Sequence, residues 1–399
     1  MNAVFQHDLL HAGTSYHDIT QHQIEALKTM FNMADAHTHQ EQSPSQKEIV
    51  NRLPELWYSA ENSRQHDLEQ KFIRRFFELQ EQPTILQRGK TLLTYAASIS
   101  MAIVSTYLRQ KNMFVSLIDP CFDNLHDLLK NMRVPLEPVE EELLHDATSI
   151  YNNLCRRVTG DALCLVDPNN PTGFTLMRHG MTKGFEQVVK FCKDKNKTLI
   201  LDLCFAPFAL IDKDMGRFDI YKLLEESGIT YITMEDTGKT WPVQDAKCAL
   251  YTASDDIYDE IYNIHTTFLL NVSPFLLNIL SEYLEDSKRD KGASVRHLLE
   301  HNRSVAKRAL AGTCLEYCEP DTKVSVGWFK IKDSVVKATE LQQLGRQREI
   351  YLLPGTFFFW SRREEGERYV RIAFARRPEV FERGIECLRD LLNEKSPIA

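Results

Sequence analysis

Short apolar runs alternate with helical segments between about residues 90 and 236, and this alternation limits the possible folds more than any other feature of the sequence. The runs typical of a buried strand are MFVSLIDP (113–120), ALCLVDPNNPTG (162–173), TLILDLCFAPF (198–208) and ITYITMED (229–236). Helical patterns, such as that of residues 176–197, lie between them. Strands that alternate with helices at this spacing form crossover units, so the sequence predicts an α/β fold with a mainly parallel sheet flanked by helices.

The pattern differs on both sides of this region. Residues 1–80 predict helices, namely ITQHQIEALKTMFNMADAH (19–37) and PSQKEIVNRLPELWYSAE (44–61), the latter preceded by the potential N-cap Ser43. A long helical stretch (274–312) precedes expected strands in VSVGWFKIK (324–332), IYLLPGTFFFW (350–360) and RYVRIAFA (368–375). We therefore expect an N-terminal helical segment (1–80) that closes over the active site, a large domain (81–275) and a smaller α+β C-terminal domain (276–399).

Composition excludes several classes of function. The 48 Lys and Arg against 56 Asp and Glu give a net charge of −8 without a long basic run, which argues against a nucleic-acid partner. The nine Cys are scattered without CxxC pairs, which favours free thiols in a reducing cytoplasm over disulfides or a zinc ribbon. The start MNAVFQHDLLHAG lacks a signal-peptide pattern, and apolar runs stay below the ~18 residues of a membrane span. We expect a cytoplasmic enzyme without a membrane partner.

Four polar residues follow or lie in different predicted strands along the chain. Asn170 lies in PNNPTG after a predicted strand, Asp202 ends the next one, Lys239 follows another in MEDTGKTWP, and Arg371 lies in YVRIAFA. Each alone could be a turn residue or a surface charge. Chemistry in parallel sheets gathers at the carboxyl ends of strands, so their joint order points to one site. The set resembles the aminotransferase-like, fold type I family of pyridoxal 5′-phosphate (PLP) enzymes over roughly residues 85–395.

The resemblance implies PLP as cofactor, the PLP-dependent transferase fold type I, and a role for each residue. Lys239 would form the Schiff base with the cofactor aldehyde, which an amino-acid substrate displaces. Asp202 would keep the pyridine nitrogen protonated, and Asn170 would bind the ring hydroxyl. Arg371 would hold the substrate α-carboxylate with its two-pronged guanidinium.

Further residues match the family or depart from it. Phe122 in DPCFDN stands where an aromatic ring stacks on the pyridine, and TYAASISMAIV (94–104) resembles the phosphate-binding turn, with Ser98 facing the anion. Lys247 stands where many relatives carry a phosphate-binding Arg, and Phe205 replaces a Tyr common in transaminases. These departures are compatible with PLP binding and argue against ordinary transamination.

Asp236 lies three residues before Lys239, where transaminases usually carry a Ser that faces the phosphate. A carboxylate against a phosphate dianion is strongly unfavourable. We therefore expect Asp236 to turn toward the substrate and to pair with a cationic side chain.

The N-terminal sequence Asp35-Ala-His37-Thr-His39 has three interpretations. It resembles the metal-binding strand of amidohydrolases, but no later set of His and Asp completes such a site, so we expect no metal. It can also be an exposed polar loop.

The third interpretation comes from a closer resemblance that spans nearly the whole chain. The segments that carry it are MADAHTHQEQSPSQKEIVNRLPELW, DPCFDNLHDLLK, PLEPVEEELLH, DPNNPTG, EDTGKTWPVQDAK and HNRSVAKRALAG. Together they resemble the PLP-dependent L-arginine oxidases and hydroxylases, in which an N-terminal helix closes over the substrate.

That resemblance implies that Asp35 and Asp236 hold the guanidinium and that His37 takes part in the chemistry. Thr20 is retained in the N-terminal helix, whereas Gln23 stands where the subgroup has a Glu, for which Glu25 is an alternative. We expect an oxidase that uses O2 as co-substrate and forms a 2-oxo guanidino acid and ammonia, with hydroxylated or dehydro products as variants. The alternatives are a PLP-dependent cyclase or dehydratase of hydroxyarginine, an aminotransferase, and a non-catalytic binding protein on the same fold. Fold type I also implies a homodimer.

Overall fold

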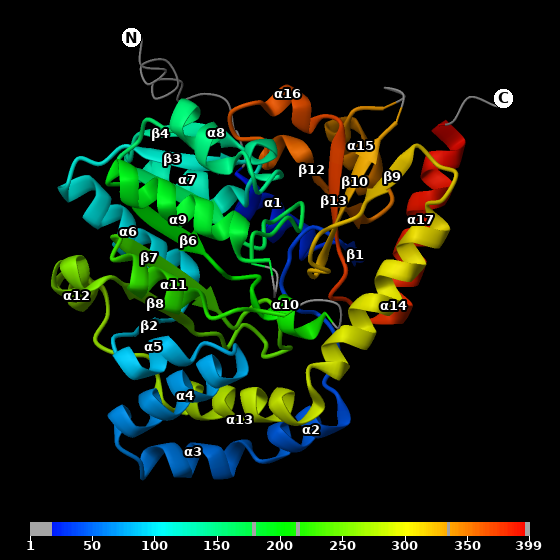
Figure 1. Cartoon of the computed structure of the whole chain (residues 1–399). Coiled ribbons are helices and arrows are strands. Elements are labelled where there is room, and N and C mark those ends of the chain that lie inside the picture. The colour runs from blue at the N-terminus through cyan, green and yellow to red at the C-terminus, as the bar shows by residue number, and fades with distance from the viewer. Residues whose placement is uncertain (1–17, 178–180, 213–215, 333–335, 396–399) are drawn as a thin grey trace.

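The apolar runs form the strands of a mixed sheet in the computed structural model, which describes residues 18–177, 181–212, 216–332 and 336–395. The strand order is β2-β8-β7-β6-β5-β3-β4; β8 runs antiparallel to both of its neighbours, and the others pair in parallel (Figure 1). The predicted α/β class with a mainly parallel sheet is confirmed. The strands are β2 (Leu92–Thr94), β3 (Val115–Asp119), β4 (Leu136–Glu140), β5 (Ala162–Val166), β6 (Thr198–Asp202), β7 (Tyr231–Asp236) and β8 (Ala249–Ala253).

Helices cover this sheet, and for that reason strands β3, β5, β6 and β7 are buried along their whole length. Their side chains belong to one apolar core with those of the covering helices. The helical elements of this region are α5 (Pro83–Arg88), α6 (Ala97–Gln110), α7 (Asp123–Asn131), η1 (Glu141–Leu144), α8 (Ile150–Arg157), α9 (Lys183–Lys195), α10 (Pro207–Ile211), α11 (Ile220–Ser227) and α12 (Asp255–Phe268).

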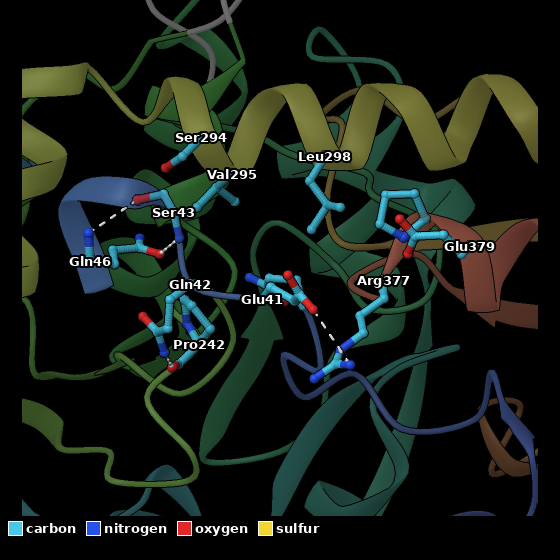
Figure 2. A pocket seen from close by; sticks show the side chains of 12 residues that line it. Glu41, Gln42, Ser43, Gln46, Pro242, Ser294, Val295, Leu298, Arg377 and Glu379 are labelled. Carbon is cyan, nitrogen blue, oxygen red and sulfur yellow. Dashed lines mark hydrogen bonds and ion pairs between the residues drawn. The ribbon is translucent and has the colours of Figure 1, made fainter. Parts of the chain in front are cut away.

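The expected helix over residues 44–61 is two helices, α2 (Pro44–Asn51) and α3 (Leu53–Glu61). The break is at Arg52, because a proline at position 54 removes a backbone donor and its ring collides with the preceding turn. The start is as predicted: the Ser43 hydroxyl accepts from the Gln46 N–H, and the Gln46 side chain accepts from the Ser43 N–H (Figure 2). Together with α4 (Gln65–Leu79), these helices pack against α13 (Pro274–Asp290) at the bottom of Figure 1.

The chain passes from the first core to a second one between α13 and α14 (Ala293–Ala309). Lys291 and Gly292 break the predicted stretch with left-handed backbone angles, φ 54° and 64°. Side chains of α13 lie in the core of the large sheet, whereas those of α14 lie in the second core. The expected boundary near 275 therefore falls one helix before the chain changes cores.

The second core lies under an antiparallel sheet in the order β12-β13-β10-β9. The expected strand over 350–360 is wrong in its second half, because the chain turns at Gly355, where a Cβ would lie 2.5 Å from the Gly366 carbonyl oxygen. The remaining elements are β9 (Leu315–Cys318), β10 (Val326–Ile331), α15 (Ala338–Arg346), β11 (Ile350–Tyr351), β12 (Leu353–Pro354), η2 (Gly355–Phe357), α16 (Arg363–Gly366), β13 (Tyr369–Ala373) and α17 (Pro378–Lys395).

The N-terminal part of the described chain bridges the two sheets. The expected helix 19–37 is wrong after Ala26, where α1 (Ile19–Ala26) ends; β1 (Phe31–Asn32) then pairs in parallel with β11. Helix α1 contacts α7 beside the large sheet (Figure 1). The centroid of its His22 ring lies 4.7 Å from that of the Phe357 ring in η2, beside the small sheet. The pairing with β11 overrides the helical periodicity because it supplies backbone partners from a distant segment.

Within the described ranges, no helix combines the length and the apolar character that crossing a bilayer requires.

Candidate active site

The carboxyl ends of β5, β6 and β7 meet at a cavity of about 250 Å³. Most of the predicted site residues line it: Thr20, His37, Ser98, Phe122, Asn170, Asp202, Asp236, Lys239 and Lys247. The other two, Asp35 and Arg371, lie behind this wall, where Asp35 contacts His37 and Arg371 contacts Asn170. The structure thus gathers the predicted residues around one space.

Lys239 follows β7 and is half-buried beside the Phe122 ring, with 5.9 Å between Nζ and the ring centroid. Burial lowers the pKa of its ammonium, and the charge of Lys247 lowers it further, while Asp236 opposes both. A lowered pKa increases the fraction of neutral amine, which is the form that attacks a carbonyl and accepts a proton.

Asp202 ends β6 and is buried, and its Oδ1 accepts from the Cys204 N–H at 3.0 Å. Burial raises the pKa of this carboxyl, and the nearby Asp236 adds to the effect. Such a group gains from a cationic N–H partner, because pairing offsets the cost of its burial.

Ala96, Ala97 and Ser98, at the start of α6, line the cavity where the phosphate turn was predicted. Asp236 lies at this turn: its Oδ1 accepts from the Gly238 N–H at 2.6 Å and its Oδ2 from the Ala97 N–H at 3.5 Å. The described structure thus places this carboxylate on one main-chain donor of its own loop and one of the expected phosphate turn, and its pairing with a substrate cation stays a prediction. Lys247 packs on Gly238, where a Cβ would lie 2.6 Å from the Lys247 Cδ.

Arg371 on β13 is buried and reaches across to the large sheet. Its Nη1 donates to the Asn170 Oδ1 at 3.0 Å, its Nη2 donates to the Ala34 carbonyl, and its guanidinium lies 4.9 Å from the Phe358 ring centroid. Because the Asn170 oxygen is engaged, the amide NH₂ is the group that can donate to a ring hydroxyl. Arg371, the predicted ligand of the substrate α-carboxylate, is thus held beside Asn170.

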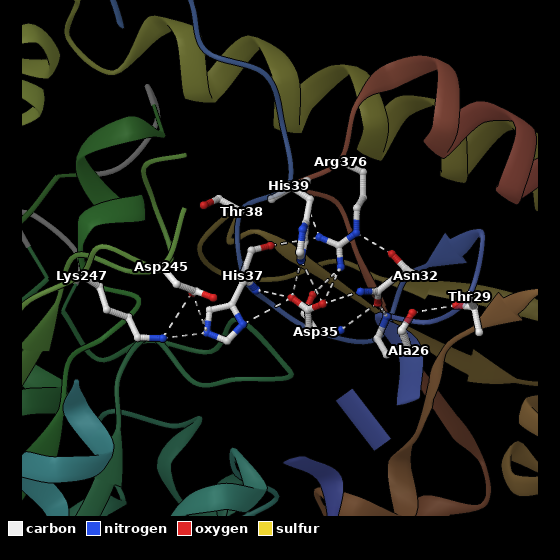
Figure 3. Close-up of polar contacts among 12 residues, drawn as sticks. Ala26, Thr29, Asn32, Asp35, His37, Thr38, His39, Asp245, Lys247 and Arg376 are labelled. Carbon is white, nitrogen blue, oxygen red and sulfur yellow. Dashed lines mark hydrogen bonds and ion pairs between the residues drawn. The ribbon is translucent and has the colours of Figure 1, made fainter. Parts of the chain in front are cut away.

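The N-terminal segment supplies a second group of polar residues. The Asp35 Oδ1 accepts from the His37 N–H at 2.8 Å and lies 3.5 Å from the His37 Nδ1, and the His39 Nε2 lies 3.0 Å from both carboxylate oxygens (Figure 3). Burial alone would raise the pKa of Asp35, but the hydrogen bonds from both histidines and the charge of Arg376 hold it well below its usual range. Asp35 is therefore a buried anion that orients His37.

His37 points from this pair into the cavity. Its Nε2 lies 3.2 Å from the Lys247 Nζ and 3.8 Å from an Asp245 carboxylate oxygen (Figure 3). The charge of Lys239 and then burial lower the pKa of His37, against the opposing effect of Asp35. A neutral ring with Nδ1–H toward Asp35 presents a basic Nε2 to the cavity.

Helix α1 contributes Thr20 and Gln23 to the cavity wall. Glu25 pairs instead with Lys28 at 2.7 Å and is not among the lining residues, so Gln23 is the residue of this pair that faces the site. Phe205 also lines the cavity, with its ring edge-on to Phe208.

Among the described residues, no three or more His, Cys, Asp and Glu side chains are arranged to hold a metal ion.

Sequence reasoning missed two residues of this region. Cys204 lines the cavity next to Asp202, and Arg376 binds the backbone of the segment that carries Asp35 and His37. A cysteine two residues after a strand-end Asp could have drawn attention. No local signal distinguishes Arg376 from its neighbour Arg377 in FARRP.

Fold and site together define a PLP-dependent enzyme with the aminotransferase fold. A model of the aminotransferase class I and II family matches residues 60–388, and the chain belongs to this family. The predicted resemblance to fold type I PLP enzymes is confirmed.

Individual relatives differ in how far they resemble the chain. The structure of MppP soaked with the product 2-ketoarginine is 31% identical, with a TM-score of 0.81, over 90% of this chain and 99% of that chain. The α-aminoadipate aminotransferase LysN from Thermus thermophilus, complexed with N-(5′-phosphopyridoxyl)-L-leucine, is 14% identical over 95% of each chain, with a TM-score of 0.75, and shows likeness of fold alone. Aromatic-amino-acid aminotransferase 2 from Thermococcus litoralis is 22% identical over 237 residues, and the match spans 59% of this chain and only 58% of that relative's length.

The donor set of the cavity fits PLP. Lys239 would hold its aldehyde, the buried Asp202 its ring nitrogen, Phe122 its ring face, and Ser98 and Lys247 its phosphate. When bound, PLP supplies an electron-withdrawing ring conjugated to the reacting carbon. Phosphate and the Asp236 carboxylate are both acceptors, so only one of them can use the Ala97 N–H.

Proposed function

We propose that this chain is a PLP- and O2-dependent oxidase of L-arginine or of a closely related guanidino amino acid. The observation that carries the proposal is the Asp35–His37 pair, a buried anion and an imidazole that the N-terminal segment brings to the cavity of Lys239. The likeness to MppP, whose product is 2-ketoarginine, supports the choice of arginine.

The proposed reaction moves two electrons and two protons from the substrate amine carbon and nitrogen to O2. O2 becomes hydrogen peroxide, and water replaces the nitrogen, which leaves as ammonia and yields a 2-oxo guanidino acid. A dehydro or hydroxylated product requires two further electrons and two protons to leave the side chain, and a second O2 accepts them as hydrogen peroxide. In the hydroxylated product, water adds to the double bond formed in this way.

This chain's residues have distinct tasks in that proposal. Lys239 removes the α-proton, which its lowered pKa favours. Arg371 holds the α-carboxylate, Asp35 and Asp236 hold the guanidinium, and the His37 Nε2 moves protons on the side that the N-terminal segment covers. Helix α1 closes over the substrate in this proposal, and the support is that its residues Thr20 and Gln23 line the cavity.

The decisive experiment compares turnover of L-arginine by the holoenzyme in air and under strict anaerobiosis, with O2 uptake and peroxide measured and products identified by mass. We expect turnover only in air, with a 2-oxo guanidino acid as product. A requirement for a 2-oxo acid co-substrate would identify an aminotransferase, and anaerobic conversion of hydroxyarginine would identify a cyclase or dehydratase. PLP-loaded protein inert toward all three would point to a binding protein.

We also propose that the enzyme is a cytoplasmic homodimer. Apolar side chains are exposed next to the phosphate turn: Leu270 is 93% and Phe268 47% exposed, and the Ser273 N–H of the same loop donates to the Tyr95 hydroxyl. A second copy of the chain would cover them. Each Cys of the sequence is a free thiol, which suits a reducing compartment. Light scattering of active enzyme tests the dimer, and a monomeric active species would contradict it.

A further inference from the structure

Arg376 follows β13 and directs its whole guanidinium at one turn of the N-terminal segment, residues 32–37 (Figure 3). Its Nε donates to the Asn32 carbonyl, its Nη1 to the His37 carbonyl at 3.0 Å, and its Nη2 to the Asp35 carbonyl at 2.6 Å. The Nη2 also lies 3.7 Å from the Asp35 carboxylate. One buried side chain thus fixes the beginning, middle and end of this turn.

The turn has a second set of bonds from its own side chains. The Asn32 Nδ2 donates to the Asp35 carboxylate at 2.5 Å, and the Asn32 Oδ1 accepts from the Ala34 N–H at 3.0 Å. Just beyond the turn, the His39 N–H donates to the Ala375 carbonyl at 2.9 Å. The first two bonds hold the turn together, and the third connects it to the segment after β13 that carries Arg376.

The chain beyond the turn is bound to the segment that follows Lys239. The Thr38 hydroxyl donates to the Trp241 carbonyl at 2.7 Å. The Gln42 side chain donates to the Pro242 carbonyl (Figure 2). The position of His37 therefore depends on two anchors, Arg376 on one side and the Lys239 segment on the other.

The side chain that this arrangement presents to the cavity is His37. Asp35, Lys239, Lys247 and Asp245 are the charged groups that act on its ring. Three carbonyl acceptors spread over one turn match a planar fork of donors, and a lysine ammonium cannot reach them all at once.

We propose that Arg376 is a positioning residue that holds the Asp35–His37 pair in register with Lys239. The catalytic use of His37 rests on the proposed function, whereas the placement of its ring by Arg376 does not. A displacement of about 1 Å at a reacting group can cost on the order of 10²-fold in rate, and we expect a loss of that order in kcat for Arg376→Lys, with little change in KM.

The test is a double-variant cycle with a matched control. Arg303 on α14 is also buried in the small domain and also donates to a carbonyl, that of Val324, but it has no contact with the turn. We expect Arg376→Lys to add no loss in a His37→Asn background, because both changes remove the same placed ring. Arg303→Lys should change kcat by the same factor in both backgrounds.

A second measurement does not depend on the reaction. The ring of His37 is titrated by NMR in holoenzyme with labelled histidine and assigned with His37→Asn. In Arg376→Lys the pKa of His37 should rise toward its ordinary value, because a loosened turn exposes the ring, whereas Arg303→Lys should leave it unchanged. Asn32→Ala loosens the same turn without touching Arg376 and should give a smaller rise.

Two results would overturn the placement by Arg376. One is a His37 titration in Arg376→Lys, or in Arg376→Gln if the lysine variant does not fold, that superimposes on the wild type. The other is losses in kcat from Arg376→Lys and His37→Asn that multiply in the double variant. Absence of O2 uptake by the wild type would instead reject the oxidase, and the titration would still decide the role of Arg376.

Discussion

The edge of the large sheet and the N-terminal segment line the same cavity, but they are positioned by different kinds of bonds. Asp202, Asp236 and Lys239 stand at or just after strands whose register is set by the pairing of their neighbours. His37 stands on a turn fixed by a side chain more than 300 residues away. Pairing of buried strands is cooperative, whereas a turn held by one guanidinium depends on a few bonds. We call the edge of the large sheet the sheet half of the cavity and the N-terminal segment its other half. We expect these two halves to respond differently to substitution.

The largest effect should come from the sheet half. Lys239→Ala removes both the covalent anchor and the α-proton acceptor, so turnover should fall by at least about 10³-fold and the yellow colour of covalently held PLP should vanish. Absorption spectra and steady-state kinetics measure both. Lys190→Ala, at an exposed lysine of α9, is the control. Wild-type turnover in Lys239→Ala would reject the PLP role of this residue.

The next effect compares a carboxylate from each half. Removing one partner of a partly buried charge pair costs about 2–5 kcal/mol, so Asp236→Ala and Asp35→Ala should each lower kcat/KM for arginine roughly thirty-fold or more, at about 1.4 kcal/mol per tenfold. Citrulline, which has no charge on its side chain, should lose much less with Asp236→Ala.

Asp35 should behave differently with citrulline, because it also orients His37. Its loss should slow both substrates and change kcat. Equal losses of arginine and citrulline in Asp236→Ala would mean that Asp236 supports the phosphate turn and does not bind the guanidinium.

A smaller effect concerns the contact between the halves, Lys247 to His37. The charges of Lys239 and Lys247 and burial all lower the pKa of His37, so Lys247→Ala should raise it. If neutral His37 is required, the acidic limb of the kcat profile should move to higher pH by several tenths of a unit to about one unit. Lys222→Ala, at an exposed lysine, should leave the limb in place.

The lowered pKa of His37 also makes the stability of the fold depend on pH. A histidine whose pKa is lowered by folding binds a proton more tightly in the unfolded chain, so its contribution to stability is lost as the pH falls below the unfolded value. For the kcat profile, a movement of the acidic limb to lower pH in Lys247→Ala would contradict the contact between Lys247 and His37.

The smallest effect lies at the far end of the N-terminal segment. Ser43→Ala removes the α2 cap and should lower the free energy of unfolding by about 1 kcal/mol, with kcat unchanged. Urea unfolding measures it, and Ser59→Ala, on α3, is the control. A drop in kcat without a change in stability would show that the cap acts on the site.

Some elements of the fold and some site residues could be predicted from the sequence, and others could not. Alternating apolar runs gave the strands of the large sheet, and strand-end motifs gave Asn170, Asp202 and Lys239, which the structure brings to one cavity. The periodicity of residues 19–37 misled, because it continues past Ala26 although the chain there pairs with β11. Asp236 was expected to face a substrate cation, and in the described structure it accepts from Gly238 and Ala97.

The sequence by itself determined the α/β fold and the order of the strand-end residues, because burial on both faces requires apolar runs and local breaks end them. Only the tertiary structure decided which distant groups hold the N-terminal segment. Arg376 and Arg377 are neighbours in the same motif, yet the buried Arg376 donates to three carbonyls of the N-terminal turn, whereas Arg377 pairs with the exposed Glu41 (Figure 2). That choice depends on how the segment after β13 meets residues 32–37, and contacts between segments more than 300 residues apart leave no periodicity in the sequence.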